Sequence, residues 1–323
     1  MDITTNICTP TIMTDSTYRP IFIVGAPRSG TTLLQRMLRS HPNICSPTGE
    51  SHFIIPLYKN QRKYSLDSPE GIKAVLEEMR RISREFVEED LHGLVFDTDS
   101  LAKEFHEMGV KSVIDVITAL FEKNMRGEGK RRWAEKTPYY ILHMETILEL
   151  YPESQFIHII RDGRDSALSM LKRRHDLKIY TVYQAAHVWK KYVDTGQKIG
   201  SSLPKDVYFE LRYEDLIEDP HKKLAEVCDF LNEPFSTKMV DFQKSKDPKT
   251  KTPLLRKEIQ KDNKNKWERQ MSLWQICLFE SIAKETLVRN KYPLASSAKP
   301  IHPLLDKVFS AHSRLATWYH CKP

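Results

Sequence analysis

Residues 25–32, GAPRSGTT, combine two glycines, one arginine and three hydroxyl side chains directly after the apolar run of residues 21–24. Glycines allow successive backbone N–H groups to turn toward one point, and a helix that follows adds the positive end of its dipole. A phosphate or sulfate group would be held at that point. The alternative is an ordinary strand-to-helix turn that happens to contain two glycines, but the full run of residue types favours an anion-binding loop.

The glycine spacing is that of the phosphate-binding loop of nucleotide triphosphate-binding proteins, with one difference. The usual loop ends in Lys followed by Ser or Thr, whereas this chain has Thr31 at the lysine position and an arginine, Arg28, earlier in the loop. We therefore predict that the anion is held without a loop lysine. The predicted ligands are Arg28, Ser29, Gly30, Thr31 and Thr32.

Residues 161–173, RDGRDSALSMLKR, form a second candidate anion site. Arg161 ends a predicted strand, and Ser169 and Arg173 are four residues apart on the helix expected to follow, so they share a face. Arginine–aspartate pairs on helices are also common as solvated ion pairs, so this motif alone leaves both interpretations open. Taken together, the two motifs predict one ligand with two separated phosphate groups.

The elements that must position these motifs follow from the apolar patterning. A short continuous apolar run predicts a buried strand at residues 21–24, residues 155–160 are a second buried-strand candidate, and residues 207–211 are predicted to be a third strand. Strands that alternate with helices predict an α/β fold, a P-loop-like central parallel sheet flanked by helices on both faces. Each motif follows a strand, so the motifs are expected to meet at the carboxyl edge of the sheet. The expected helices cover about residues 31–40, 70–91, 98–125, 139–150, 163–174, 181–200, 219–231 and 270–290.

Two long stretches between these elements are predicted to be loops. Residues 43–67 contain several prolines, and residues 243–267 are strongly polar and Lys-rich without apolar periodicity. Loops of this length inside a domain are usually functional or disordered. A shorter piece, residues 131–138, is predicted to be extended and to end at Pro138.

The two anion motifs resemble those of the PAPS-dependent sulfotransferases, whose donor is 3′-phosphoadenosine 5′-phosphosulfate. The similarity is to the branch that contains bacterial sulfotransferases and the tyrosylprotein sulfotransferases, and it covers roughly residues 20–270. In that family a PRSGTT loop binds the 5′-phosphosulfate and an R-x-G-R-x-x-x-x-S run binds the 3′-phosphate. This chain has both, at residues 27–32 and 161–169. The resemblance implies PAPS as co-substrate, adenosine 3′,5′-bisphosphate as product, and no metal.

The same resemblance implies catalytic residues. In the family, a lysine near the position of Lys136, in WAEKTP, contacts the bridging oxygen between phosphate and sulfate, where negative charge grows in the transition state. A glutamate after the first helix removes the acceptor proton, which makes Glu50 in SPTGESHF the candidate base. Partial burial would raise the pKa of this carboxylate toward a value suited to a base. His52 is the alternative base, and Arg28 is expected to assist catalysis from the loop.

Two further site residues rest on weaker similarity. Tyr213 in LRYEDL matches a family tyrosine that lies near the nucleotide, although it could equally be a core tyrosine with a bonded hydroxyl. Lys266 in NKWE resembles a lysine in a late loop that closes over the 3′-phosphate. The Lys-rich composition around it suits an anion lid and also a solvated linker.

Composition sets wider bounds. The 323 residues carry a net charge of +7, which suits an anionic ligand, nucleic acid, a membrane surface or simply a soluble surface. We predict a flexible arm at residues 1–19, a single sulfotransferase domain at 20–295 and a C-terminal tail at 296–323. The five cysteines are scattered and odd in number, which argues against a disulfide framework or a zinc site.

Location and partners follow from the absence of sequence signals. The sequence shows no secretion signal and no apolar stretch of membrane-spanning length, so we predict a cytoplasmic protein. The predicted partner is a small alcohol, phenol or amine acceptor, with no nucleic acid and no membrane. The oligomeric state stays open, with a homodimer as one possibility.

Two other functions compete with this prediction. A P-loop kinase of a small molecule is disfavoured by Thr31 at the lysine position. A non-catalytic nucleotide- or RNA-binding module is suggested by the basic charge. It is disfavoured because the basic residues lie at the motif positions and no aromatic-basic RNA signature is present.

Overall fold

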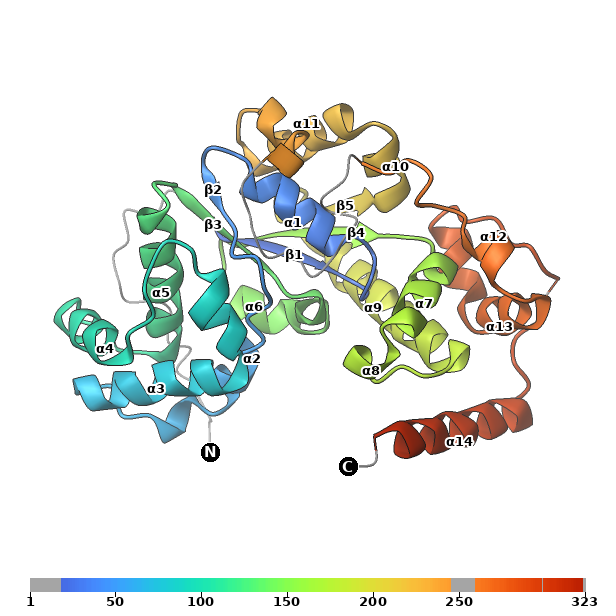
Figure 1. The fold of residues 1–323 in the computed structure, drawn as a ribbon, viewed down its shortest axis with the longest axis horizontal. Helices are drawn as coiled ribbons and strands as arrows, with labels where there is room; N and C mark the ends of the chain where they lie inside the picture. Colours follow the sequence, from blue (N-terminus) through green and yellow to red (C-terminus); the bar gives the residue numbers. More distant parts are fainter. Residues whose placement is uncertain (1–18, 245–258, 298, 322–323) are drawn as a thin grey trace.

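A parallel β-sheet forms the centre of the computed structural model, which describes residues 19–244, 259–297 and 299–321 (Figure 1). Within this part of the chain the sheet has five strands in the order β2-β3-β1-β4-β5, and every neighbouring pair is parallel. The strands are β1 (Ile21–Gly25), β2 (Ile44–Cys45), β3 (Arg132–Lys136), β4 (Gln155–Ile160) and β5 (Tyr208–Arg212). All three predicted strands are therefore confirmed, while the predicted arm lies almost wholly outside the described residues.

Both faces of the sheet are covered, as the apolar runs predict. Alternate side chains of β1 point to opposite faces, and all of its residues are fully buried. Ile21 and Ile23 pack with residues of α1 (Thr31–Arg39) and α11 (Pro220–Leu231), whereas Phe22 packs with α5 (Val113–Gly127) and α6 (Met144–Leu150) on the other side. The predicted α/β sandwich with helices on both faces is confirmed.

The remaining helices extend these two layers. They are α2 (Ile54–Lys59), α3 (Pro69–Ile82), α4 (Thr98–Glu107), α7 (Gly163–Lys172), α8 (Arg174–Leu177), α9 (Val182–Gly200), α10 (Tyr213–Glu218), α12 (Trp267–Gln270), α13 (Leu273–Arg289) and α14 (Pro303–His320). Short 3-10 or π turns lie at η1 (Gln61–Lys63), η2 (Phe86–Asp90), η3 (Pro138–His143), η4 (Thr237–Met239) and η5 (Phe242–Lys244).

Several helix boundaries differ from the sequence prediction. The helix expected at 98–125 is two helices, α4 and α5, because Gly109 adopts a left-handed φ of 77° between them. The loop expected at 43–67 contains β2 and α2, which are too short to produce a clear apolar period. Of the loop expected at 243–267, residues 245–258 lie outside the described residues.

Four strands deliver their carboxyl ends to the same edge of the sheet. Lys136 is the last residue of β3, Gly25 the last of β1, and Arg161 directly follows β4. Tyr213 follows β5 and begins α10. Because the strands are parallel and adjacent, residues far apart in the sequence are brought together there.

Helix α14 lies within the predicted C-terminal tail and packs beside α9 (Figure 1). Its contacts with α9 are both polar and apolar: the Ser313 and Thr181 hydroxyls are 2.8 Å apart, the Tyr183 hydroxyl donates to Asp306 at 2.7 Å, and the Phe309 ring stacks on Tyr183. Its outer face exposes apolar side chains such as Leu304 and Leu315. Among the helices that the structure describes, none has both the length and the apolar character needed to cross a membrane.

Candidate active site

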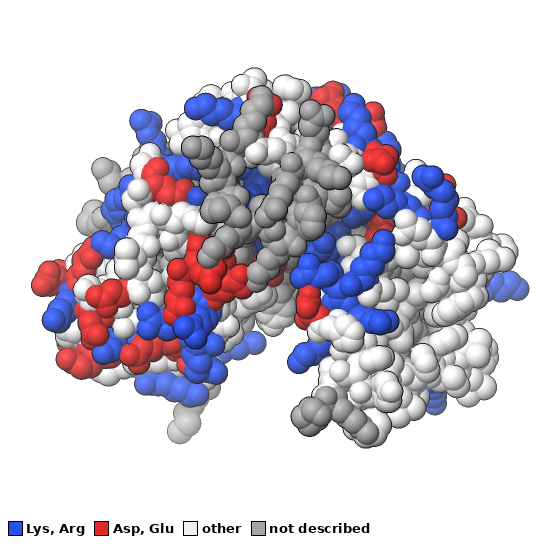
Figure 2. Space-filling model, in the orientation of Figure 1, with Lys and Arg blue, Asp and Glu red and all other residues white. Residues whose placement is uncertain are grey.

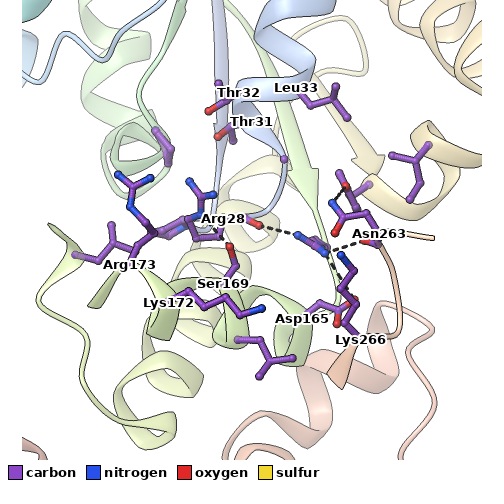
Figure 3. A pocket seen from close by; sticks show the side chains of 18 of the residues that line it. Arg28, Thr31, Thr32, Leu33, Asp165, Ser169, Lys172, Arg173, Asn263 and Lys266 are labelled. Carbon is purple, nitrogen blue, oxygen red and sulfur yellow. Dashed lines mark hydrogen bonds and ion pairs between the residues drawn. The ribbon is translucent and has the colours of Figure 1, made fainter. Parts of the chain in front are cut away.

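A cavity of about 810 Å³ opens at this sheet edge, between the loop after β1, helix α7 and the segment before α12 (Figure 3). A cavity of this size accommodates a nucleotide together with a small acceptor. Most of the predicted site residues line it. They are Arg28, Gly30, Thr31, Thr32, Glu50, His52, Arg161, Ser169, Arg173, Tyr213 and Lys266. The other two, Ser29 and Lys136, are buried and are not among the lining residues.

The loop after β1 has the geometry of an anion cradle. Gly30 has a φ of 101° and forms the N-terminal cap of α1, and a Cβ there would lie 2.4 Å from the Tyr213 ring. Only glycine combines this backbone conformation with that close approach. The Ser29 side chain is fully buried, and its Oγ has no hydrogen-bond partner among the described residues. The loop therefore holds an unused hydroxyl at the N-terminus of a helix.

Arg28 lies where the loop meets α7. Its Nε donates to Ser169 Oγ at 3.0 Å, so residues from the two predicted motifs are in direct contact (Figure 3). Burial and the nearby charges of Arg173 and Arg161 lower the pKa of the Arg28 guanidinium. An anion bound beside Arg28 would offset the repulsion that Arg173 and Arg161 exert on it.

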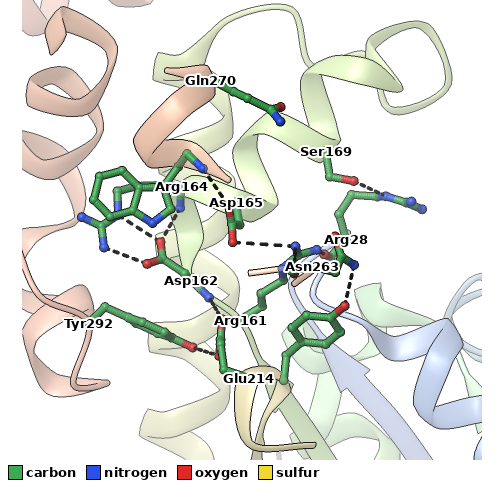
Figure 4. A network of polar contacts seen from close by, with 12 residues as sticks. Arg28, Arg161, Asp162, Arg164, Asp165, Ser169, Glu214, Asn263, Gln270 and Tyr292 are labelled. Carbon is green, nitrogen blue, oxygen red and sulfur yellow. Dashed lines mark hydrogen bonds and ion pairs between the residues drawn. The ribbon is translucent and has the colours of Figure 1, made fainter. Parts of the chain in front are cut away.

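Arg161 lies on the opposite side of the loop and is held from three directions (Figure 4). Its guanidinium donates to the Asn263 carbonyl at 2.8 Å, lies 3.8 Å from Asp165 Oδ2, and stacks 4.5 Å from the Tyr213 ring centre. The Tyr213 hydroxyl in turn accepts from Asn263 Nδ2 at 2.6 Å. Arg161 Nε is buried and has no hydrogen-bond partner among the described residues.

The other arginine of the second motif, Arg164, is structural. It is fully buried and pairs with Asp162 at 2.7 Å (Figure 4). It also pairs with Glu280 of α13 at 2.6 Å. Its guanidinium also stacks on the ring of Trp267, 3.6 Å from the ring centre. Trp267 directly follows Lys266, the residue predicted to bind the 3′-phosphate. The contact with Arg164 therefore fixes the segment that carries Lys266.

The outer wall of the cavity is cationic. Arg173 is 42% exposed and pairs with Asp176, and Lys172 and Lys266 also line the cavity. Figure 2 shows Lys and Arg side chains gathered over α7 and α8, whereas acidic side chains concentrate toward α3 and α4. This separation of charge directs an anionic ligand toward the predicted donor site.

Glu50, His52 and Lys136 meet at the other end of the cavity. The Lys136 ammonium donates to Glu50 Oε1 at 2.6 Å, and His52 Nε2 lies 3.1 Å from Glu50 Oε2. Lys136 is 3% exposed, whereas the Glu50 side chain is 35% exposed and faces the cavity. The structure therefore places both predicted catalytic groups in contact with each other.

The expected raised pKa of Glu50 is wrong. Burial does act to raise the pKa, but the Lys136 charge and the hydrogen bonds from His52 and Lys136 outweigh it and lower the pKa to about 2. Nothing in the sequence places Lys136 beside Glu50, so the expected pKa of Glu50 rested on burial alone.

Sequence reasoning missed several residues of the cavity. Tyr139 and Tyr192 line it at the Glu50 end, and burial, with Tyr139 and Glu50 nearby, raises the pKa of the Tyr192 hydroxyl to about 12. Asn263 lines it at the other end and holds both Arg161 and Tyr213. Tyr139 could have been found, since it follows the Lys-Thr-Pro run. Tyr192 lies mid-helix in α9 without a distinguishing signal.

These observations fit a nucleotide with two phosphate groups. Ser29 Oγ and Arg161 Nε are buried and have no hydrogen-bond partner among the described residues, and Arg161 and Arg173 place further positive charge near Arg28. Over residues 19–244, 259–297 and 299–321, no three His, Cys, Asp or Glu side chains form a possible metal-binding group.

Comparisons with known proteins agree with the motifs. The model of the sulfotransferase family matches residues 20–237. The chain is 24% identical to a protein-tyrosine sulfotransferase of Drosophila melanogaster over 75% of its own length and 44% of that protein. It is 27% identical to a putative protein-tyrosine sulfotransferase of Caenorhabditis briggsae over 68% of each chain.

The chain spans only part of some curated relatives. The chain spans 30% of an uncharacterised protein of Aquifex aeolicus to which it is 25% identical, so it spans less than half of this relative and of the fly protein. The similarity to them therefore concerns one part of each relative.

Solved structures share the fold. The sulfotransferase domain of the Synechococcus PCC 7002 olefin synthase superposes with a TM-score of 0.59 at 23% identity, covering 84% of this chain and 97% of that one. The sulfotransferase domain from the curacin biosynthetic pathway superposes with a TM-score of 0.62 at 23% identity, covering 86% and 99%. Since the family model covers two thirds of the sequence and the central sheet is the same, this chain belongs to the sulfotransferase family.

Proposed function

We propose that this chain transfers a sulfuryl group from PAPS to an acceptor hydroxyl or amine and releases adenosine 3′,5′-bisphosphate. One observation carries the proposal: the anion loop, Arg161 and the Lys136–Glu50 pair converge on a single cavity. A donor with two separated phosphates and an acceptor whose proton must be removed require this combination of groups. The match to the family supports the same chemistry.

The donor is proposed to lie along the loop and α7. Ser29, Thr31 and the N-terminus of α1 would hold the 5′-phosphosulfate, and Arg161 with Ser169 would hold the 3′-phosphate. Tyr213, Arg173 and Lys266 complete this end of the cavity. Arg28 lies between the two phosphate sites because it bonds to Ser169 while belonging to the loop.

The chemistry is proposed to run between Lys136 and Glu50. The acceptor oxygen or nitrogen forms the new bond to sulfur, and its proton passes to the Glu50 carboxylate. The bond between sulfur and the bridging oxygen breaks, and its electron pair stays on that oxygen. Lys136 and Arg28 stabilise the charge that appears there.

The donor assignment is tested by binding. The bisphosphate should bind more tightly than ADP or AMP, and Arg161→Ala should remove about 1.5–3 kcal/mol of that preference, roughly ten- to a hundredfold. Arg84→Ala, an exposed arginine that pairs with Glu88, is the matched control and should leave the affinity unchanged. Equal affinity of the unmodified chain for ADP and the bisphosphate would refute the proposed donor.

The role of Glu50 is tested by transfer kinetics. Glu50→Gln should lower the transfer rate about 10²–10⁴-fold, with a smaller loss for acceptors that are already partly ionised, and should leave bisphosphate binding unchanged. If Glu50→Gln retains full activity while His52→Ala is inactive, His52 is the base. Activity of both variants with weakly acidic alcohols would show that neither residue is.

The acceptor class is proposed from the cavity and the relatives together. Small alcohols, phenols and amines are proposed to bind beside Tyr139 and Tyr192, which line the cavity at the Glu50 end. The protein-tyrosine sulfotransferases among the relatives add tyrosine-containing peptides as candidates. Transfer of labelled sulfate from PAPS to a panel of all four classes decides between them.

A further inference from the structure

The last two residues of β3 hold two consecutive residues of the loop that carries Glu50. Side chains alternate along a strand, so Glu135 and Lys136 point to opposite sides. Lys136 reaches the Glu50 carboxylate at 2.6 Å, and Glu135 contacts the next residue, Ser51. The pair Glu50–Ser51 is thus held at both positions by adjacent residues of one buried strand.

Glu135 accepts hydrogen bonds from this loop and from Thr137, which directly follows β3. Its Oε1 accepts from the Ser51 amide at 3.2 Å, from the Ser51 hydroxyl at 2.9 Å and from the Thr137 hydroxyl at 2.5 Å. The Ser51 hydroxyl also lies 2.8 Å from the Tyr140 hydroxyl. Glu135 Oε2 is buried and has no hydrogen-bond partner among the described residues. A buried carboxylate with one unused oxygen is costly for stability alone, which points to a functional reason for it.

The loop needs such an anchor because its backbone is unusual. His52 has a left-handed φ of 52°, which a residue with a side chain adopts at a cost in free energy. Ser51 lies between this residue and Glu50 and is fully buried. Fixing the Ser51 amide and hydroxyl therefore fixes the direction in which the Glu50 side chain points.

We infer that Glu135 is a positioning residue for the attacking side of the reaction: by holding Ser51, it keeps the Glu50 carboxylate against Lys136. The effect of Glu135 on the transfer rate rests on the proposed function, whereas the effect of Glu135 on the loop does not. Glu135 touches neither the cavity nor a substrate, since it does not line the cavity and is 1% exposed.

The first test follows the loop without any turnover. Glu135→Met keeps the length of the side chain and removes both acceptor oxygens, so hydrogen exchange of the peptide covering residues 49–54 should become faster. Glu135→Gln retains one carbonyl oxygen that can accept from Ser51 and should restore most of the protection. Bisphosphate affinity should stay within twofold in both variants. Unchanged exchange in Glu135→Met would overturn the inference.

The second test measures transfer kinetics. Glu135→Met should lower kcat on the order of 10- to 100-fold with little change in the KM for PAPS, and Glu135→Gln should recover most of the loss. In a Glu50→Gln background the same Met substitution should cost far less, because the group it positions is already absent. An equal loss in both backgrounds would show that Glu135 does not act through Glu50.

Asp115→Leu is the matched control. Asp115 is also a fully buried carboxylate that accepts from backbone amides, of Lys111 at 3.2 Å and Ser112 at 2.9 Å, but it caps α5 away from the cavity. This variant should lose stability and keep both kcat and the exchange of residues 49–54. If the unmodified chain transfers no sulfuryl group, the proposed function fails, and the exchange experiment still decides the role of Glu135.

Discussion

Glu50 and Lys136 act on opposite sides of the proposed reaction and yet share a hydrogen bond of 2.6 Å. While the pair is intact, the pKa of Glu50 is about 2 and the carboxylate is a weak base. In the proposed reaction, an ammonium that turned toward the oxygen of the departing bisphosphate would remove the strongest stabilising charge from the carboxylate and make it more basic. We therefore expect proton removal and leaving-group stabilisation to be coupled through one lysine.

The ion pair predicts a pH dependence of stability. The folded-state pKa of Glu50, about 2, lies below the ordinary value of 4.5, so its contribution to stability is complete above pH 4.5 and is lost as the pH falls toward 2. The stability of the unmodified chain relative to Glu50→Gln should therefore decline between pH 4.5 and pH 2. Thermal melts of both proteins from pH 6 to pH 2.5 measure this difference.

Lys136→Met provides the control for that experiment. With the ammonium removed, the main cause of the low pKa is gone, so the Glu50→Gln difference should depend much less on pH. A difference that stays constant with pH in the unmodified chain would contradict the ion pair as described.

Two glycines shape the junction between β1 and α1, and Gly30 is the one that contacts Tyr213. Gly30→Ala should destabilise the chain, because a left-handed backbone costs alanine about 1–3 kcal/mol of folding free energy. The added Cβ would also displace the Tyr213 ring. Because Tyr213 stacks on Arg161, bisphosphate affinity should fall as well. Gly109→Ala is the control: Gly109 has a φ of 77° with no atom within 4 Å of the added Cβ, so only stability should fall. Melting temperature and bisphosphate titration separate the two effects.

Helices α7, α12 and α13 are joined by Arg164. Arg164→Met should cost about 3–5 kcal/mol, because it leaves Asp162 and Glu280 buried without their cation. Urea unfolding measures this loss. The comparison is Arg84→Met, which breaks a pair whose arginine is 79% exposed and should change stability by less than about 0.5 kcal/mol. A loss of less than about 1 kcal/mol of unfolding free energy for Arg164→Met would contradict this stabilising role of the buried charge cluster.

Across the whole molecule, the positive charge needed at the donor site comes from the protein itself. Arg28, Arg161 and Lys136 arise from three different strand ends and converge on one edge of the sheet. We therefore expect transfer from PAPS to continue in EDTA and ATP to give no phosphoryl transfer with or without Mg²⁺. Both are measured by product assays at saturating acceptor. Loss of activity in EDTA that Mg²⁺ restores would favour the kinase alternative.

The amino-acid sequence by itself determined the fold class and identified most of the residues that line the cavity at the proposed donor end. The apolar run at residues 21–24 and the largely apolar residues 155–160 are typical of strands buried on both faces, and such strands occur mostly in parallel sheets covered by helices. The anion loop and the arginine after β4 each follow a strand directly, so local geometry already places them at the same edge. These predictions depend only on residues that are close together in the sequence.

Only the tertiary structure decided the relations between residues far apart in the sequence. The pairing of Glu50 with Lys136 joins positions 86 residues apart, and it reverses the expected direction of the Glu50 pKa. The hydrogen bonds between Glu135 and Ser51, and the position of Tyr192 near Glu50, also depend on tertiary packing between distant parts of the chain. A side chain's charge state and partners depend on which surfaces the packed core brings together, and no local pattern in the sequence encodes that distance.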